Sequence, residues 1–143
     1  MDVLEVRRTI RATPEQLFDA WTQPPHLLEW WGPPGIDCID AQVDLRVGGN
    51  YRIANRLPDG RVLWISGEFG VIDRPRKLVY TWSLQVGTTV AEIVTVLFEP
   101  RGDRTEVVVR HERIPDLATR DVHRQGWEGC LDGLDHYAQR TSV

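Results

Sequence analysis

The sequence has few of the features that mark secreted or membrane-spanning proteins. Its two cysteines, Cys38 and Cys130, form no CxxC pair and no disulfide framework, so we interpret both as small buried hydrophobic residues. No run approaches the ~18 apolar residues of a membrane span, and the N-terminus lacks the apolar region of a signal peptide. We therefore expect a cytoplasmic protein with no membrane span.

Lysine is almost absent, since Lys77 is the only one, and the net charge is −4. A chain with this charge offers no basic footprint for nucleic acid, so we expect no nucleic-acid partner. The sequence also lacks a GxSxG nucleophile elbow, a phosphate loop and a dinucleotide fingerprint. We accordingly expect no cofactor.

Tryptophan, in contrast, is abundant for a chain of 143 residues, which contains six of them. The length fits one compact domain, residues 1–143. Each tryptophan can bury on the order of 150–250 Å². Because six are hard to pack tightly in a small domain, we expect some of them to line a pocket.

The first third of the chain predicts one strand and two short helices. Residues 3–11 alternate as a strand with one wet face. Thr13, followed by Pro14 and Gln16, forms a capping-box signature for a helix. The two prolines after Gln23 end this helix and start another, which Gly-Pro-Pro-Gly ends at residues 32–35. Its apolar side would consist of Leu27, Leu28, Trp30 and Trp31.

From residue 37 the hydrophobic period changes to two, and it predicts six further strands separated by turn sequences. They are expected at residues 37–47, 50–56, 61–72, 77–84, 91–99 and 104–113. The first would place Ile39, Ala41, Val43, Leu45 and Val47 on one face.

Residues 116–140 predict a long helix with one apolar arc. The arc comprises His123, Trp127, Cys130, Leu131, Leu134, Tyr137 and Ala138. Gly126, Gly129 and Gly133 fall beside it, although glycine inside a helix costs about 1 kcal/mol relative to alanine. Three on one stripe indicate either close packing or space kept open next to the core.

This order predicts an α+β fold, in which a curved antiparallel sheet of about seven strands wraps a C-terminal helix around a cavity. Several segments in the same order resemble the activator-of-heat-shock-protein-ATPase-homologue branch of the START-related (SRPBCC) helix-grip superfamily. They are Ala12-Thr13-Pro14, Trp21-x-x-Pro24, Leu28-x-x-Trp31-Gly32-Pro33, Asp44-x-Arg46-x-Gly48-Gly49, Gly67-x-Phe69, Thr81-Trp82, His111-Glu112 and Gly126-Trp127. The resemblance implies a helix-grip fold with an apolar pocket. The family's members include chaperone co-activators, binders of lipids or aromatic ligands, and cyclases.

The last hairpin suggests where polar groups enter the cavity. If Pro100–Asp103 is an even-length turn, cross-strand partners sum to 203, and Glu92 faces His111 on the inner face. Such a pair could bind a ligand, catalyse acid–base chemistry, or be purely structural. His123 could approach the same region. Because no HxH or HxxxH spacing supports a metal site, we expect none.

The remaining candidates are aromatic. Tyr80 and Trp82 share an inward strand face with Leu78 and Leu84, so they are either pocket walls or plain core. Trp30 and Trp31 point about 100° apart on their helix, so one would anchor it and the other would line the cavity. With Glu92, His111, His123, Gly126 and Trp127, these complete the predicted ligand-binding set.

Three functions remain open. The first is binding of a small hydrophobic molecule, aromatic or lipid-like, between the sheet and the last helix. The second is a cofactor-independent enzyme of the cyclase or hydratase type that uses Glu92 and His111. The third is a chaperone-linked protein-binding module, although the chain lacks the additional domain of a eukaryotic-type chaperone activator. An exposed edge strand or the two-Trp corner could support a homodimer.

Overall fold

The computed structural model describes residues 3–84 and 91–141 and has the predicted order of elements. One strand and two short helices precede six strands and a long helix. The elements are β1 (Leu4–Ile10), α1 (Pro14–Thr22), α2 (Pro24–Trp30), β2 (Asp37–Val43), β3 (Asn50–Arg56), β4 (Val62–Asp73), β5 (Lys77–Leu84), β6 (Glu92–Arg101), β7 (Arg104–Glu112) and α3 (Leu117–Thr141).

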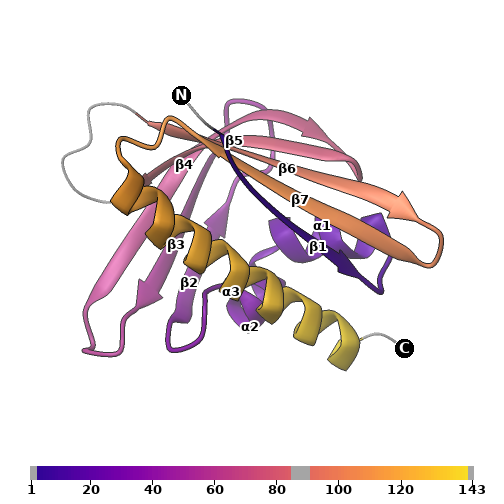
Figure 1. The fold of residues 1–143 in the computed structure, drawn as a ribbon, viewed down its shortest axis with the longest axis horizontal. Helices are drawn as coiled ribbons and strands as arrows, with labels where there is room; N and C mark the ends of the chain where they lie inside the picture. The colour runs from indigo at the N-terminus through magenta and orange to yellow at the C-terminus, as the bar shows by residue number, and fades with distance from the viewer. Residues whose placement is uncertain (1–2, 85–90, 142–143) are drawn as a thin grey trace.

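The strands form one sheet in the order β1-β7-β6-β5-β4-β3-β2, and all neighbours are antiparallel. The sheet curls, and α3 runs along its open side with α1 and α2 near one end (Figure 1). This is the predicted α+β helix-grip architecture. None of the helices that the structure describes combines the length and hydrophobicity that crossing a bilayer requires.

The capping box at the start of α1 is confirmed. The Thr13 side chain accepts a hydrogen bond from the Gln16 amide, and the Gln16 side chain accepts one from the Thr13 amide. Gln23 then serves both as the C-cap of α1 and as the N-cap of α2. The C-terminal end of α2 lies close to α3, because a Cβ on Gly133 would come within 3.0 Å of the Trp30 carbonyl oxygen.

Tandem tryptophans end α2 and have different backbone conformations. Trp30 is the last helical residue, whereas Trp31 is the C-cap with an extended backbone at φ −66° and ψ 136°. Both side chains are buried, but the prediction that Leu28 shares their apolar side is wrong, because Leu28 is 43% exposed. A helix of two turns has room for only a narrow apolar stripe against the sheet, and Leu28 falls outside it.

The strand predicted at residues 37–47 is shorter than expected. The pairing with β3 shifts between Cys38 and Asp40, which bulges Ile39 out, and the strand ends at Val43. Ile39, Leu45 and Val47 are therefore exposed, unlike Ala41, with which they were predicted to share a strand face. Beyond the strand, a Cβ on Gly49 would lie only 2.1 Å from the Asp44 carbonyl oxygen, so this tight turn requires glycine.

The β6–β7 hairpin is two residues longer than predicted at the turn end. Arg101 pairs with Arg104 around Gly102 and Asp103, so partners sum to 205 rather than 203. Val94, and not Glu92, is consequently opposite His111. A shift of two residues leaves every side chain on its face, so Glu92 and His111 still point inward and meet diagonally.

Candidate functional site

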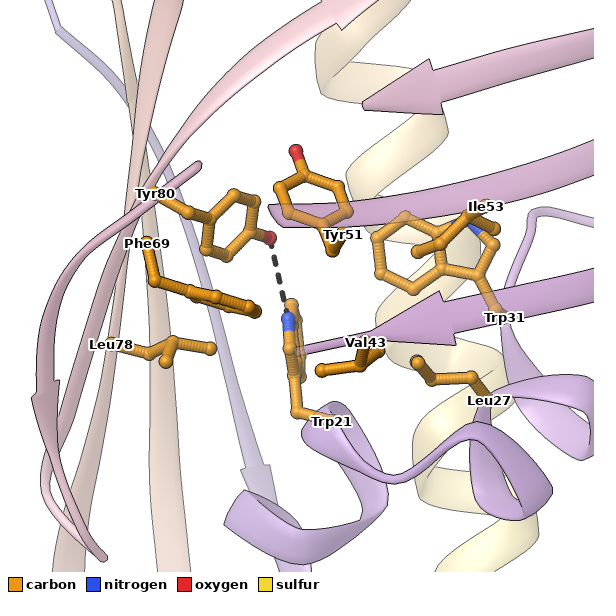
Figure 2. A pocket seen from close by; sticks show the side chains of 9 residues that line it. All are labelled: Trp21, Leu27, Trp31, Val43, Tyr51, Ile53, Phe69, Leu78 and Tyr80. Atoms are coloured by element: carbon orange, nitrogen blue, oxygen red, sulfur yellow. Dashed lines mark hydrogen bonds between the residues drawn. The ribbon is translucent and has the colours of Figure 1, made fainter. Parts of the chain in front are cut away.

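Two of the hollows bounded by the described residues lie between the sheet and the helices and differ greatly in size. The smaller, which we call the small void, measures about 20 Å³. It is lined by Trp21, Leu27, Trp31, Val43, Tyr51, Ile53, Phe69, Leu78 and Tyr80 (Figure 2). This volume holds about one water molecule. The interior around Trp21 is therefore essentially filled.

The polar side chains of Trp21, Trp30 and Tyr51, in and beside the small void, have hydrogen-bond partners within the protein. The Trp21 indole N–H donates to the Tyr80 hydroxyl at 3.3 Å, drawn as the dashed line in Figure 2. The Tyr51 hydroxyl donates to the Thr81 carbonyl at 2.6 Å, and the Trp30 indole N–H donates to the Ala20 carbonyl at 2.8 Å. This region has the hydrogen bonding of an ordinary protein core.

The larger region, which we call the large cavity, measures about 200 Å³. The N-terminal half of α3, strands β3 to β5 and the segment after α2 enclose it. Its lining residues are Trp31, Pro33, Ile36, Asn55, Leu57, Leu63, Ile65, Trp82, Leu84, Val122, His123, Gly126, Trp127 and Cys130. Leu84 and Val122 are 42% and 67% exposed, so they form the rim through which the cavity opens to solvent. Leu84 lies on the predicted inward face of its strand, since it lines the cavity, but it does so at the exposed rim.

The glycines of α3 explain why the cavity stops where it does. A Cβ on Gly126 would meet no atom within 4 Å, so this residue borders open space. A Cβ on Gly129 would lie 2.7 Å from the Cβ of Pro33, and one on Gly133 would lie 3.0 Å from the Trp30 carbonyl oxygen. The glycine stripe therefore serves both of the purposes predicted for it. Gly126 keeps space open, whereas Gly129 and Gly133 permit close packing.

Two polar atoms in the wall of the large cavity lack partners. Within the described residues, Asn55 Oδ1 and Trp82 Nε1 are the buried side-chain polar atoms that make no hydrogen bond. Their residues are only 6% and 8% exposed. An unpaired buried polar atom costs about 1–3 kcal/mol, so two in one cavity wall need an explanation.

Beside the cavity, Glu92, His111 and His123 form a compact cluster. His111 Nε2 lies 2.6 Å from Glu92 Oε1, and His123 Nε2 lies 3.1 Å from the same oxygen. The two imidazole rings stack with centroids 4.5 Å apart. The Trp127 indole N–H donates to His111 Nδ1 at 3.0 Å. Because Nδ1 accepts, a neutral His111 carries its proton on Nε2 and donates it to Glu92.

Burial dominates the electrostatics of this cluster. It lowers the pKa of His111 to about 3, with a smaller contribution from the charge on His123, and it lowers the pKa of His123 as well. Burial raises the pKa of the Glu92 carboxyl. Both histidines are therefore neutral at pH 7. His123 is the member of the cluster that lines the large cavity.

The same three side chains offer possible metal ligands within 4.8 Å of one another. A metal-bound imidazole uses the lone pair of one nitrogen and donates the N–H of the other. In His111 the second nitrogen faces the Trp127 N–H, which is itself a donor. Metal binding through Nε2 would set two donors against each other, so the cluster does not suit a metal ion. That the protein has no metal site remains a prediction, and the hydrogen bond from Trp127 to His111 supports it.

The structure brings most of the predicted site residues together. Trp31, Trp82, His123, Gly126 and Trp127 line the large cavity, and Glu92 and His111 contact His123 from behind. Two residues lie elsewhere. Trp30 packs against Trp21 with ring centroids 5.1 Å apart, and Tyr80 lines the small void.

Sequence reasoning missed Asn55. The inward positions of β3 are Tyr51, Ile53 and Asn55, so the alternation that places two apolar residues in the core also places an amide there. A polar residue at an inward strand position was the available signal. Cys130, predicted as a buried hydrophobic residue, is buried and lines the cavity, whereas Cys38 is only half-buried.

Comparison with known proteins agrees with this architecture. The profile of the family "Activator of Hsp90 ATPase homolog 1-like protein" matches residues 11–139. No curated protein matches the sequence.

Several solved structures have the same fold. The AHSA1 protein SPO3351 of Silicibacter pomeroyi has a TM-score of 0.87 at 23% identity, covering 97% of this chain and 99% of that one. Protein NE0264 of Nitrosomonas europaea has a TM-score of 0.84 at 20% identity, with coverages of 98% and 97%. CalU16 of Micromonospora echinospora has a TM-score of 0.74 at 23% identity, with coverages of 94% and 74%. Because the family profile spans most of the sequence, the chain belongs to the activator of Hsp90 ATPase homolog 1-like family.

Proposed function

We propose that the protein binds a small, mainly apolar molecule in the large cavity between β3–β5 and α3. The observation that carries the proposal is a mainly apolar cavity of about 200 Å³ between the sheet and α3, beside a closely packed region around Trp21. An apolar cavity of about 150 Å³ is known to hold benzene, whereas drug-sized ligands occupy roughly 300–1,000 Å³. This size favours the aromatic ligand over the lipid-like one, because a long acyl chain would not fit.

Titration with small rings tests the proposal. Toluene, phenol and indole are suitable probes, and binding would be followed by amide shifts in NMR spectra. At least one should bind saturably to the wild-type protein. The Gly126→Leu variant should abolish binding, because the new side chain occupies the cavity. The matched Gly126→Ala variant adds one methyl group and should keep binding. Equal titrations of the wild-type and Gly126→Leu proteins would refute the proposal.

A second candidate, acid–base catalysis, is favoured by one observation. His123 lines the cavity and has its Nε2 3.1 Å from a carboxylate that His111 also contacts. A neutral imidazole beside a carboxylate is a common arrangement for a general base. In this candidate His123 exchanges the proton with the ligand, Glu92 stabilises the imidazolium, and His111 positions Glu92. The cyclase or hydratase hypothesis thus moves its reactive imidazole from His111 to His123.

Hydrogen exchange tests this candidate without a known substrate. A general base in the cavity should accelerate exchange of the α-protons of cyclohexanone in D₂O. The acceleration should be lost in His123→Gln and Glu92→Gln, while binding of toluene persists in both. If the wild-type protein and these variants give the same exchange rate, the acid–base candidate fails and ligand binding stands.

Other hypotheses stay predictions. A chaperone-linked role has the family's name in its favour. A homodimer, a cytoplasmic location and a single domain over residues 1–143 likewise remain expectations from the sequence. Pull-down and light scattering would test the first two.

A further inference from the structure

The unpartnered atoms Asn55 Oδ1 and Trp82 Nε1 belong to opposite chemical kinds. An indole N–H can only donate a hydrogen bond, and a carbonyl oxygen can only accept one. Both residues are more than nine-tenths buried and both line the large cavity. By contrast, the indole N–H groups of Trp21, Trp30 and Trp127 all have acceptors inside the protein. The wall of the large cavity therefore holds one unpaired donor and one unpaired acceptor.

The two atoms come from different places in the cavity wall. Asn55 lies on β3 and Trp82 on β5, and β4 separates these strands. Two strand spacings put the backbones roughly 10 Å apart. They are also offset along the sheet, because Asn55 pairs with Leu63 whereas Ser83, next to Trp82, pairs with Ser66. A single ligand that satisfies both atoms therefore carries its polar groups at separate positions.

The charge of the wall limits the ligand further. Among the described residues that line the large cavity, none is lysine or arginine. The ionisable residues in the wall are His123 and Cys130, both neutral at pH 7, and Glu92 lies behind His123. Moving an ionised carboxylate into apolar surroundings without a cation is strongly unfavourable, and the neighbouring acid adds repulsion. A fatty acid or an aromatic acid is a poor match for this wall.

From these three observations we infer that the ligand is a neutral single-ring molecule with a hydrogen-bond acceptor at one position and a donor at another. Its acceptor takes the Trp82 indole N–H, and its donor goes to Asn55 Oδ1. The ring lies over the apolar side chains of Leu63 and Ile65 on β4, between the two polar contacts. This inference rests on the proposed function, since it specifies the ligand of the same cavity.

Three probes of similar size separate the contributions. p-Xylene fills the cavity without polar groups, 4-hydroxybenzyl alcohol adds two neutral hydroxyls, and 4-hydroxybenzoate is ionised at pH 7. Calorimetric titration should rank 4-hydroxybenzyl alcohol tightest. Each added hydrogen bond should be worth about a five- to tenfold decrease in Kd relative to p-xylene. 4-Hydroxybenzoate should bind more weakly than the alcohol by at least that factor.

Two variants assign the contacts. Trp82→Phe removes the donor together with one ring of the indole, and Asn55→Leu removes the acceptor at nearly constant volume. Each should weaken 4-hydroxybenzyl alcohol about five- to tenfold more than it weakens p-xylene, which reports the change in cavity shape alone. Folding should be preserved, because each change removes an unpaired buried atom; thermal unfolding verifies this.

The outcomes distinguish the two proposals. If p-xylene binds and the alcohol binds no more tightly, or if both variants keep wild-type affinity for the alcohol, this inference is overturned and the proposed function stands. Tighter binding of 4-hydroxybenzoate would also overturn it. If no probe binds at all, the proposed function fails and this inference fails with it.

Discussion

The interior around Trp21 and the interior around Trp82 are built from the same kinds of side chains, and Trp31 borders both. Around Trp21 the rings pack in contact, the polar groups pair, and only about 20 Å³ is empty. Around Trp82 about 200 Å³ is empty and two polar atoms are unpaired. Packing therefore stabilises one region, whereas the other keeps a hollow at a cost that packing alone does not explain.

The glycines of α3 show how one residue type serves both regions. Gly129 and Gly133 let the helix approach the segment after α2 within van der Waals distance. Gly126, one turn earlier, leaves space in front of the sheet. The cavity is thus a property of a single helical turn, which makes the two regions separable by point substitution.

Replacing Trp21 or Trp82 by alanine should give the largest difference in stability between the two regions. Trp21→Ala should lower the free energy of unfolding by about 3–5 kcal/mol, because it empties a packed site and leaves the Tyr80 hydroxyl without its donor. Trp82→Ala should cost less, since one side of Trp82 already faces the cavity. Urea denaturation of both variants measures the difference. Equal losses would mean that the two regions are equally packed.

Lowering the pH should lower the free energy of unfolding, and the groups responsible lie in the region around Trp82. The folded pKa of His111, about 3, lies below its unfolded value near 6.5, so the unfolded state takes up the proton first as pH falls. Between pH 6.5 and 5 this should cost about 2 kcal/mol, and the lowered pKa of His123 acts in the same direction. The raised pKa of Glu92 acts oppositely, because its folded state holds the proton more tightly.

Denaturation at several pH values checks this prediction, with His111→Gln as the control. The variant keeps an acceptor for Trp127 and a donor for Glu92 but does not titrate, so its stability should depend less on pH between 6.5 and 5. The region around Trp21 contributes tyrosines, whose pKa values burial raises above 10, so they do not titrate in this range. Parallel curves for the wild-type protein and the variant would contradict the assignment to His111.

Alanine at two glycines should change stability in opposite directions. Gly129→Ala forces a Cβ to within 2.7 Å of Pro33 and should cost about 1–3 kcal/mol. Gly126→Ala meets open space and should gain up to about 1 kcal/mol from helix propensity. Thermal unfolding of the two variants is a direct measurement. A loss at Gly126 would show that this turn of α3 has no room for a methyl group.

Sequence patterns predicted most of the architecture, because each element depends on local signals. The capping box at Thr13, the alternation along β5 and the apolar arc of α3 all specify which face is buried. Errors occurred where geometry is set between elements. The bulge at Ile39 and the two-residue turn at Gly102 depend on pairing with a neighbouring strand, which no local pattern encodes.

The candidate site was predictable only in part, for a related reason. Inward alternation identified Trp82, Glu92 and His111 as facing the interior. Whether an inward side chain meets a neighbour or a void depends on how far apart the sheet and α3 lie. Tyr80 and Trp82 are two residues apart on one strand, yet Tyr80 lines the small void and Trp82 lines the large cavity.

The smallest expected effect is a difference between the alkylation rates of the two cysteine thiols. Burial raises the pKa of Cys130, in the cavity wall, to about 12, and that of half-buried Cys38 to about 11. Only the thiolate reacts with alkylating reagents, so at pH 8 iodoacetamide should modify Cys38 before Cys130, and both more slowly than free cysteine. Peptide mass spectrometry over time gives both rates. If Cys130 reacts first, the wall of the large cavity is more accessible to water than the region around Cys38, and the cavity is then a poor place for an apolar ligand.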